Sequence, residues 1–107
     1  MEIEIIVAND FSKTPQSREE GDEFREDYLM PKFLIAREIG HKLNVILDGA
    51  EGYATSFLEA AFGGLAKEYS PAEVLQTVVF QCEDEPSLID EISRYIRDAD
   101  KAKWLQK

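Results

Sequence analysis

The stretch that most constrains the fold is NVILDGAEGYATSFLEAAFGGLA, which spans residues 44–66. Its pattern predicts a buried strand over Val45 to Asp48, a glycine-bearing turn over Gly49 to Ala54, and a helix opening at Thr55 or Ser56. A strand that feeds a helix through a short loop places that loop at the carboxyl end of the sheet, where α/β proteins bind ligands and partners. We therefore expect any functional site to include this loop.

The loop gathers two carboxylates, a phenol, two hydroxyls and two glycines. The candidate site residues are Asp48, Gly49, Glu51, Gly52, Tyr53, Thr55 and Ser56. Ser56 and Glu59 have the spacing of a capping box, in which the hydroxyl and the carboxylate satisfy backbone amides at a helix start. Capping therefore gives Ser56 a purely structural interpretation beside the functional one.

The rest of the chain alternates strand and helix signals. Apolar, β-branched runs predict strands over residues 2–8, 43–47 and 77–81, and helical periodicity predicts helices over 22–38, 56–69, 71–76 and 86–99. Pro31 predicts a kink near Asp27 to Met30 or a restart at Pro31, and Gly40 predicts a left-handed helix end. The order predicts one α/β domain over residues 1–107, with a small, mainly parallel sheet of three to four strands packed against helices.

Residues 9–21 are expected to form a long polar loop around Pro15. Lys13 and Arg18, with the hydroxyls between them, could hold an anion, or the loop is simply solvated. Trp104, near the end of the chain, either folds back onto the core or is an exposed docking residue.

The composition disfavours several classes of function. A net charge of −10 disfavours binding to nucleic acid and to anionic membranes. His41 is the only histidine and Cys82 the only cysteine, so we expect no catalytic pair, no metal cluster and no cofactor. The amino-terminal MEIEIIV lacks the pattern of a signal peptide, and the expected compartment is the cytoplasm.

Four stretches together resemble a bacterial STAS-like family of unknown function, small relatives of the STAS (sulfate transporter and anti-sigma factor antagonist) domains. They are VILDGAEGYATSFLEAAFGGL, DFSKTPQSR, GDEFRE and PSLIDEISRYI, and they cover most of the chain. The resemblance implies a STAS-like α/β fold. It also implies a non-enzymatic regulatory module that binds a protein partner such as a kinase-like ATPase.

In STAS antagonists an aspartate, two serines and a glycine open a helix, and the partner kinase phosphorylates the first hydroxyl. The resemblance places Ala54 at the aspartate, Thr55 at the phosphoacceptor, Ser56 beside it and Phe57 at the glycine. This chain therefore departs from the pattern at Ala54 and Phe57, and its candidate phosphoacceptors are Thr55 and Ser56.

Two other functions remain open. Asp48 and Glu51 could hold Mg²⁺ while Lys13 and Arg18 receive a phosphate, in a ligand-binding domain or an enzyme. Alternatively, the chain is a dimeric scaffold that pairs through an edge of its sheet.

Overall fold

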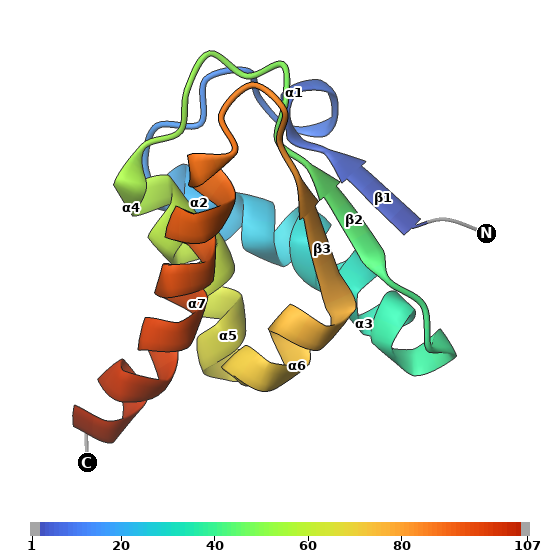
Figure 1. Ribbon diagram of the computed structural model, residues 1–107, viewed down its shortest axis with the longest axis vertical. Helices are drawn as coiled ribbons and strands as arrows, with labels where there is room; N and C mark the ends of the chain where they lie inside the picture. Colours follow the sequence, from blue (N-terminus) through green and yellow to red (C-terminus); the bar gives the residue numbers. More distant parts are fainter. Residues whose placement is uncertain (1–2, 106–107) are drawn as a thin grey trace.

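The sheet has three strands, all parallel, in the order β1 (Ile3–Ile6), β2 (Leu43–Ile46), β3 (Val78–Gln81) (Figure 1). The computed structural model describes residues 3–105, with side chains for residues 3–99. Ile5, Val45 and Phe80 lie side by side across the sheet. The small parallel sheet and the central place of β2 are as the sequence predicts. The strand predicted over residues 2–8 ends earlier, because the chain turns into helix at Val7.

Helical segments make up most of the remaining chain. They are α1 (Val7–Asp10), α2 (Arg18–Phe24), η1 (Arg25–Leu29), α3 (Met30–Ile39), α4 (Thr55–Leu58), η2 (Glu59–Gly63), α5 (Gly64–Glu68), α6 (Pro71–Thr77) and α7 (Ser87–Leu105). The two η segments are π-helical, so α2–η1–α3 and α4–η2–α5 each run as one continuous helix. None of the helices within residues 3–105 is long and apolar enough to span a membrane.

The helices cover one face of the sheet. Side chains that alternate onto that face are buried, among them Ile5, Val45 and Val78. The other face carries the residues between them, and Val79 there is 44% exposed. The fold is thus a two-layer α/β sandwich in which the second sheet face lies open. The side chain of Trp104 is outside the described set.

The first long helix begins earlier than predicted. Ser17 Oγ accepts a hydrogen bond from the Glu20 amide at 3.1 Å, while Glu20 Oε1 accepts from the Ser17 amide at 3.2 Å. This capping box starts α2 at Arg18 instead of Asp22. The loop predicted over residues 9–21 therefore shrinks to residues 11–17.

Pro31 interrupts the helical hydrogen bonding within the predicted range. A proline cannot donate to the preceding turn, and its ring crowds the carbonyl four residues back. The helix widens into the π-helical η1 before Pro31, where the Met30 amide donates a hydrogen bond to the Arg25 carbonyl five residues back. Pro31 then falls in the first turn of α3, and Gly40 ends the helix at φ 74°, the left-handed cap that the sequence predicts.

The helix after β2 starts at Thr55, but the capping box predicted for Ser56 and Glu59 is wrong. Ala54 occupies the N-cap position, with φ −73° and ψ 143° and no side-chain cap. Ser56 Oγ instead donates to the Gln16 carbonyl at 3.5 Å. The cap predicted at Ser70 is confirmed, since its hydroxyl accepts from the Glu73 amide at 3.2 Å.

Candidate functional site

Three loops meet at the carboxyl end of the sheet, where the sequence places the candidate site (Figure 1). The Glu51 amide donates to the Lys13 carbonyl at 2.8 Å, and the Ala54 amide donates to the Pro15 carbonyl at 3.1 Å. Pro15 is buried beneath these bonds. Because backbone bonds tie residues 11–17 to the loop after β2, the two loops form one ordered surface. We call this the carboxyl-edge surface, meaning the exposed groups of residues 11–17 and 49–56.

Asp48 joins the third loop to the same edge. Its Oδ1 accepts from the amides of both Glu83 and Asp84 at 2.8 Å, and the Gly49 amide donates to Asp84 Oδ2 at 3.3 Å. Gly49 sits at φ 93°, a conformation that glycine adopts without strain. The Asp48 side chain therefore has a structural role, since its hydrogen bonds link the loop after β2 to the loop after β3; we call this link the Asp48 clasp.

We expect Asp48→Ala to lower the free energy of unfolding by about 1–3 kcal/mol, because two loop amides lose a charged acceptor. The measurement is urea denaturation followed by circular dichroism. Glu51→Ala is the matched control, since Glu51 is exposed and its carboxylate makes no hydrogen bond or ion pair within the described residues. Equal midpoints for Asp48→Ala and the wild type would contradict the clasp.

Tyr53 also has a structural role. Its hydroxyl donates to the Leu47 carbonyl at 2.8 Å, and its ring lies 6.1 Å from that of Phe57. Burial, reinforced by the nearby Cys82 thiol and Asp48 carboxylate, raises the pKa of the Tyr53 phenol. Burial likewise raises the pKa of the Cys82 thiol. Both groups are thus held in their neutral forms at physiological pH, which suits packing and not nucleophilic chemistry.

The magnesium interpretation finds no support in this geometry. One Asp48 oxygen is already committed to two amides, and Glu51 points its polar group to solvent. Among the side chains of residues 3–99, no group of three or more His, Cys, Asp or Glu residues is placed to hold a metal ion.

Several candidate residues remain accessible on the carboxyl-edge surface. Lys13, Glu51 and Thr55 are exposed, and no atom lies within 4 Å of the Cβ that a side chain at Gly52 would add. Thr55 is the first residue of α4, so its hydroxyl stands at the positive end of a continuous helix that runs to Glu68. The exposed groups project from a backbone that is held by hydrogen bonds.

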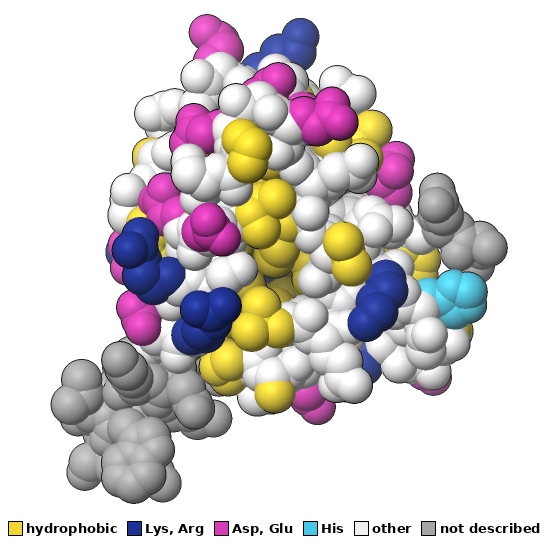
Figure 2. Space-filling model, in the orientation of Figure 1, with side chains coloured by type: hydrophobic (Ala, Val, Ile, Leu, Met, Phe, Trp, Pro, Cys, Tyr) yellow, Lys and Arg dark blue, Asp and Glu magenta, His cyan; other side chains and the backbone are white. Residues whose placement is uncertain are grey.

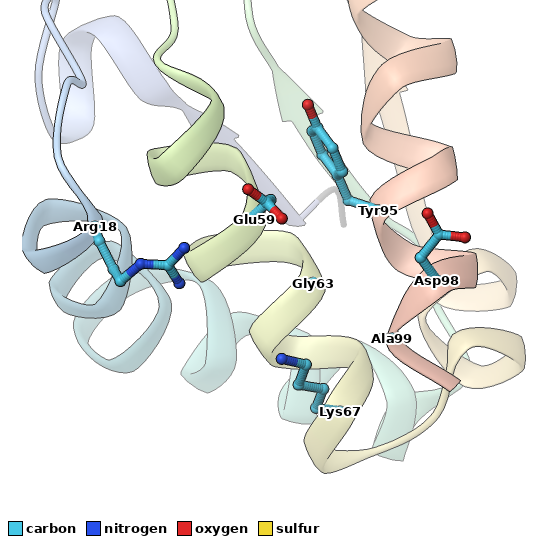
Figure 3. A pocket seen from close by; sticks show the side chains of 7 residues that line it. All are labelled: Arg18, Glu59, Gly63, Lys67, Tyr95, Asp98 and Ala99. Atoms are coloured by element: carbon cyan, nitrogen blue, oxygen red, sulfur yellow. The ribbon is translucent and has the colours of Figure 1, made fainter. Parts of the chain in front are cut away.

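Arg18 is separated from this surface and lines a pocket of about 270 Å³ beside it. The pocket lies where α2, η2–α5 and α7 meet, and its lining residues are Arg18, Glu59, Gly63, Lys67, Tyr95, Asp98 and Ala99 (Figure 3). Lys13 is not among them, so the predicted pairing of Lys13 with Arg18 around an anion is not formed here. Gly63 faces α7, and a Cβ there would lie 3.6 Å from the Tyr95 carbonyl oxygen, an ordinary van der Waals contact.

Tyr95 connects this pocket to Thr55. Its hydroxyl donates to Glu91 Oε2 at 2.5 Å and lies within hydrogen-bonding reach of the Thr55 side chain. Burial and the bond to Glu91 raise the pKa of Tyr95. Sequence reasoning missed Tyr95 and Lys67 as neighbours of the site, because only the tertiary fold brings α7 and the end of α5 beside α2. The Ser17–Glu20 capping box was the one local signal that could have moved Arg18 from the loop to the helix.

Comparison with known families finds one match. A family model described as a STAS-like domain of unknown function matches residues 20–88, which include α2 through β3 and the first residues of α7. A search of the curated proteins and a search of the solved structures found no similar protein.

Proposed function

The chain belongs to the family of STAS-like domains of unknown function, and we propose that it is a non-enzymatic regulatory module that docks a protein partner on its carboxyl-edge surface. The observation that carries the proposal is the hydrogen bonding of this surface. Its backbone is fixed by the Glu51–Lys13 and Ala54–Pro15 bonds, while the side chains of Lys13, Glu51 and Thr55 are exposed. A pre-ordered, exposed surface loses little conformational entropy when a partner binds.

The potentially reactive groups at this edge are used structurally. Asp48 holds two amides, Tyr53 holds the Leu47 carbonyl, and Cys82 is 8% exposed. What remains outward is Lys13, Glu51 and Thr55, which form a contact surface and not a catalytic pair.

Thr55 is the proposed regulatory residue, and the partner is proposed to be a kinase-like ATPase. The hydroxyl is exposed to a kinase, and a phosphate at a helix start is favoured by the helix dipole. Its neighbours are acidic, however, with Glu59 one helical turn on and Glu91 on the same Tyr95 hydroxyl. A phosphate would add nearly two negative charges to this acidic surface. We therefore expect phosphorylation to release the partner and leave the fold unchanged.

The test is quantitative capture of partner proteins from the source cells on tagged versions of the chain. We expect Gly52→Arg and Thr55→Glu each to lower recovery of the partner at least about tenfold, which corresponds to roughly 1.4 kcal/mol. Gly52→Arg adds bulk and charge at a position with open space around it, so the fold should tolerate it.

Ala72→Arg is the matched control, because it adds the same side chain at an exposed position on α6, which precedes β3 and so lies at the opposite end of the sheet. A partner retained by wild type and Ala72→Arg but lost by the two loop variants supports the proposal. If Gly52→Arg and Thr55→Glu bind every recovered protein as the wild type does, the proposal fails.

A further inference from the structure

The two edge strands of the sheet, β1 and β3, differ in whether their outward backbone groups are hydrogen-bonded. In a parallel strand, alternate residues direct their amide and carbonyl to opposite sides. On the outer side of β1, the Ile6 amide donates to Asp10 Oδ2 at 2.8 Å, and Lys32 Nζ donates to the Glu4 carbonyl at 2.9 Å. Side chains therefore cap the β1 edge, as soluble proteins do to prevent another strand from pairing there.

Among the side chains of residues 3–99, no such cap is found on the β3 edge. The Leu47 amide donates to the Gln81 carbonyl at 2.8 Å, so Gln81 faces β2, and the Phe80 amide and carbonyl face outward. Within the described residues, no partner is found for the amides of Phe80 and Cys82 or for the carbonyls of Val78 and Phe80. The Val78 amide, by contrast, is satisfied by the Val74 carbonyl.

The surface beside this edge is apolar. Figure 2 shows a hollowed strip of hydrophobic side chains in the region between β3 and α7. Phe80 is half-buried and packs its ring against that of Phe62, with 5.2 Å between the centroids. Val79, 44% exposed, and Leu75, 39% exposed, are two of the large hydrophobic residues that the fold leaves open. An open edge next to exposed apolar side chains is a template for strand pairing.

Charged side chains lie along the same edge. The loop that follows β3 carries exposed Glu83, Asp84 and Glu85. From that loop α7 runs back beside β3 (Figure 1). Exposed Arg94 and Arg97 lie about 10–15 Å along α7, roughly the length of a four-residue strand, with exposed Asp90 and Asp98 on the same stretch. The loop at the carboxyl end of β3 is thus uniformly acidic, whereas Arg94 and Arg97 are the positive charges further along α7, and Figure 2 shows acidic and basic side chains mixed there.

We propose that a second copy of this chain pairs antiparallel along the β3 edge, which goes beyond the docking function proposed above. With a twofold axis at Phe80, each Phe80 amide donates to the Phe80 carbonyl of the other copy. Each Cys82 amide likewise donates to the Val78 carbonyl of the other copy. This register uses the four unpartnered groups of β3 and leaves out the Val78 amide, which is already bonded.

The same arrangement is self-complementary in charge. Antiparallel pairing turns the acidic loop of one copy towards the part of α7 that carries Arg94 and Arg97 in the other. This local attraction is needed because two copies that each carry a net charge of −10 repel one another at long range. A polyanionic or uniformly acidic partner would not match both ends of the edge, whereas a second copy does. The pairing would join two three-stranded sheets into one.

The test is multi-angle light scattering over a roughly hundredfold concentration range, since association follows mass action. We expect the wild type to shift from monomer towards dimer as its concentration rises. Val79→Lys should weaken the dimer at least about tenfold, because a charged side chain at the middle of the edge opposes strand pairing. Ile35→Lys is the matched control: Ile35 is 51% exposed on α3, away from β3, and its replacement should leave the dimer intact.

A second measurement tests the register. The twofold axis at Phe80 makes Val79 and the Gln81 of the other copy a non-hydrogen-bonded pair, whose Cβ atoms approach closely enough for a disulfide. In a Cys82→Ala background, an oxidised mixture of Val79→Cys and Gln81→Cys chains should cross-link more than either chain alone. A monomer at every concentration would overturn the proposal and leave the edge to a strand of another protein. A Val79→Lys dimer as tight as the wild type, or cross-linking that is equal in all samples, would overturn it as well.

Discussion

Phe57→Ala is expected to lower the free energy of unfolding by about 3–5 kcal/mol, the largest effect of any substitution considered for this chain. Phe57 is fully buried. Its ring centroid lies 5.7 Å from that of Phe24, 6.0 Å from that of Phe11 and 6.1 Å from that of Tyr53. Phe24 belongs to α2, whereas Phe11 and Tyr53 belong to two of the three loops at the carboxyl end of the sheet. Packing around the Phe57 ring therefore holds these loops against the core.

Urea denaturation measures this loss directly. Leu75→Ala is the control, because Leu75 is 39% exposed and its truncation removes little buried surface. A Phe57→Ala loss below about 1 kcal/mol would show that the aromatic cluster does not hold the loops, since full truncation of a buried phenylalanine costs several times more.

Phe57 also gives a physical account of the departure from the STAS signature. The resemblance places it where STAS antagonists have glycine, directly after the two hydroxyls. In this chain the position points into the aromatic cluster instead of leaving space. The start of α4 is therefore anchored by the packing of Phe57, while the Thr55 side chain is exposed on the outside.

Gly21→Ala is expected to lower the free energy of unfolding by about 1–3 kcal/mol through overpacking. A Cβ at Gly21 would lie 2.6 Å from the Phe57 carbonyl oxygen and 2.7 Å from the Ala60 Cβ. Neither atom can rotate away, since one is backbone and the other is fixed to it. In an open helix the same change would instead stabilise by up to about 1 kcal/mol, because alanine is the better helix former.

Gly52→Ala is the matched control for that change, because nothing lies within 4 Å of its added Cβ. We expect its unfolding midpoint to stay near the wild-type value. The measurement is thermal unfolding of both variants beside the wild type. A Gly21→Ala chain more stable than the wild type would mean that α2 does not pack against α4 and η2 as closely as described.

Local sequence patterns predicted the elements well where each element carries its own signal. The β-branched runs at Ile5 and Val45 marked two strands, and Ser70 with Glu73 marked a helix start. The prediction for Ser56 was wrong because α4 begins at Thr55 behind an uncapped Ala54, and the Ser56 hydroxyl instead forms a bond to the Gln16 carbonyl. That bond joins residues 40 apart in the chain, which no local pattern records.

The candidate site was predictable in position but not in roles. The strand-loop-helix pattern predicted a loop between the second strand and the next helix, and the structure has that loop between β2 and α4. It could not show that Asp48 is committed to amides 35 and 36 residues away, nor that Arg18 lies with Lys67 and not with Lys13. Both outcomes depend on which helices and loops pack together.

Amide hydrogen exchange with and without the captured partner tests the docking surface most directly. In the free chain, the amides of Gly52 and Tyr53 have no hydrogen-bond partner among the described residues, so they should exchange quickly. We predict that the partner slows exchange at these amides and in residues 11–17, while α3 and α6 stay unchanged. Slower exchange confined to α3 or α6, with residues 11–17 and 49–56 unaffected, would contradict the proposed surface.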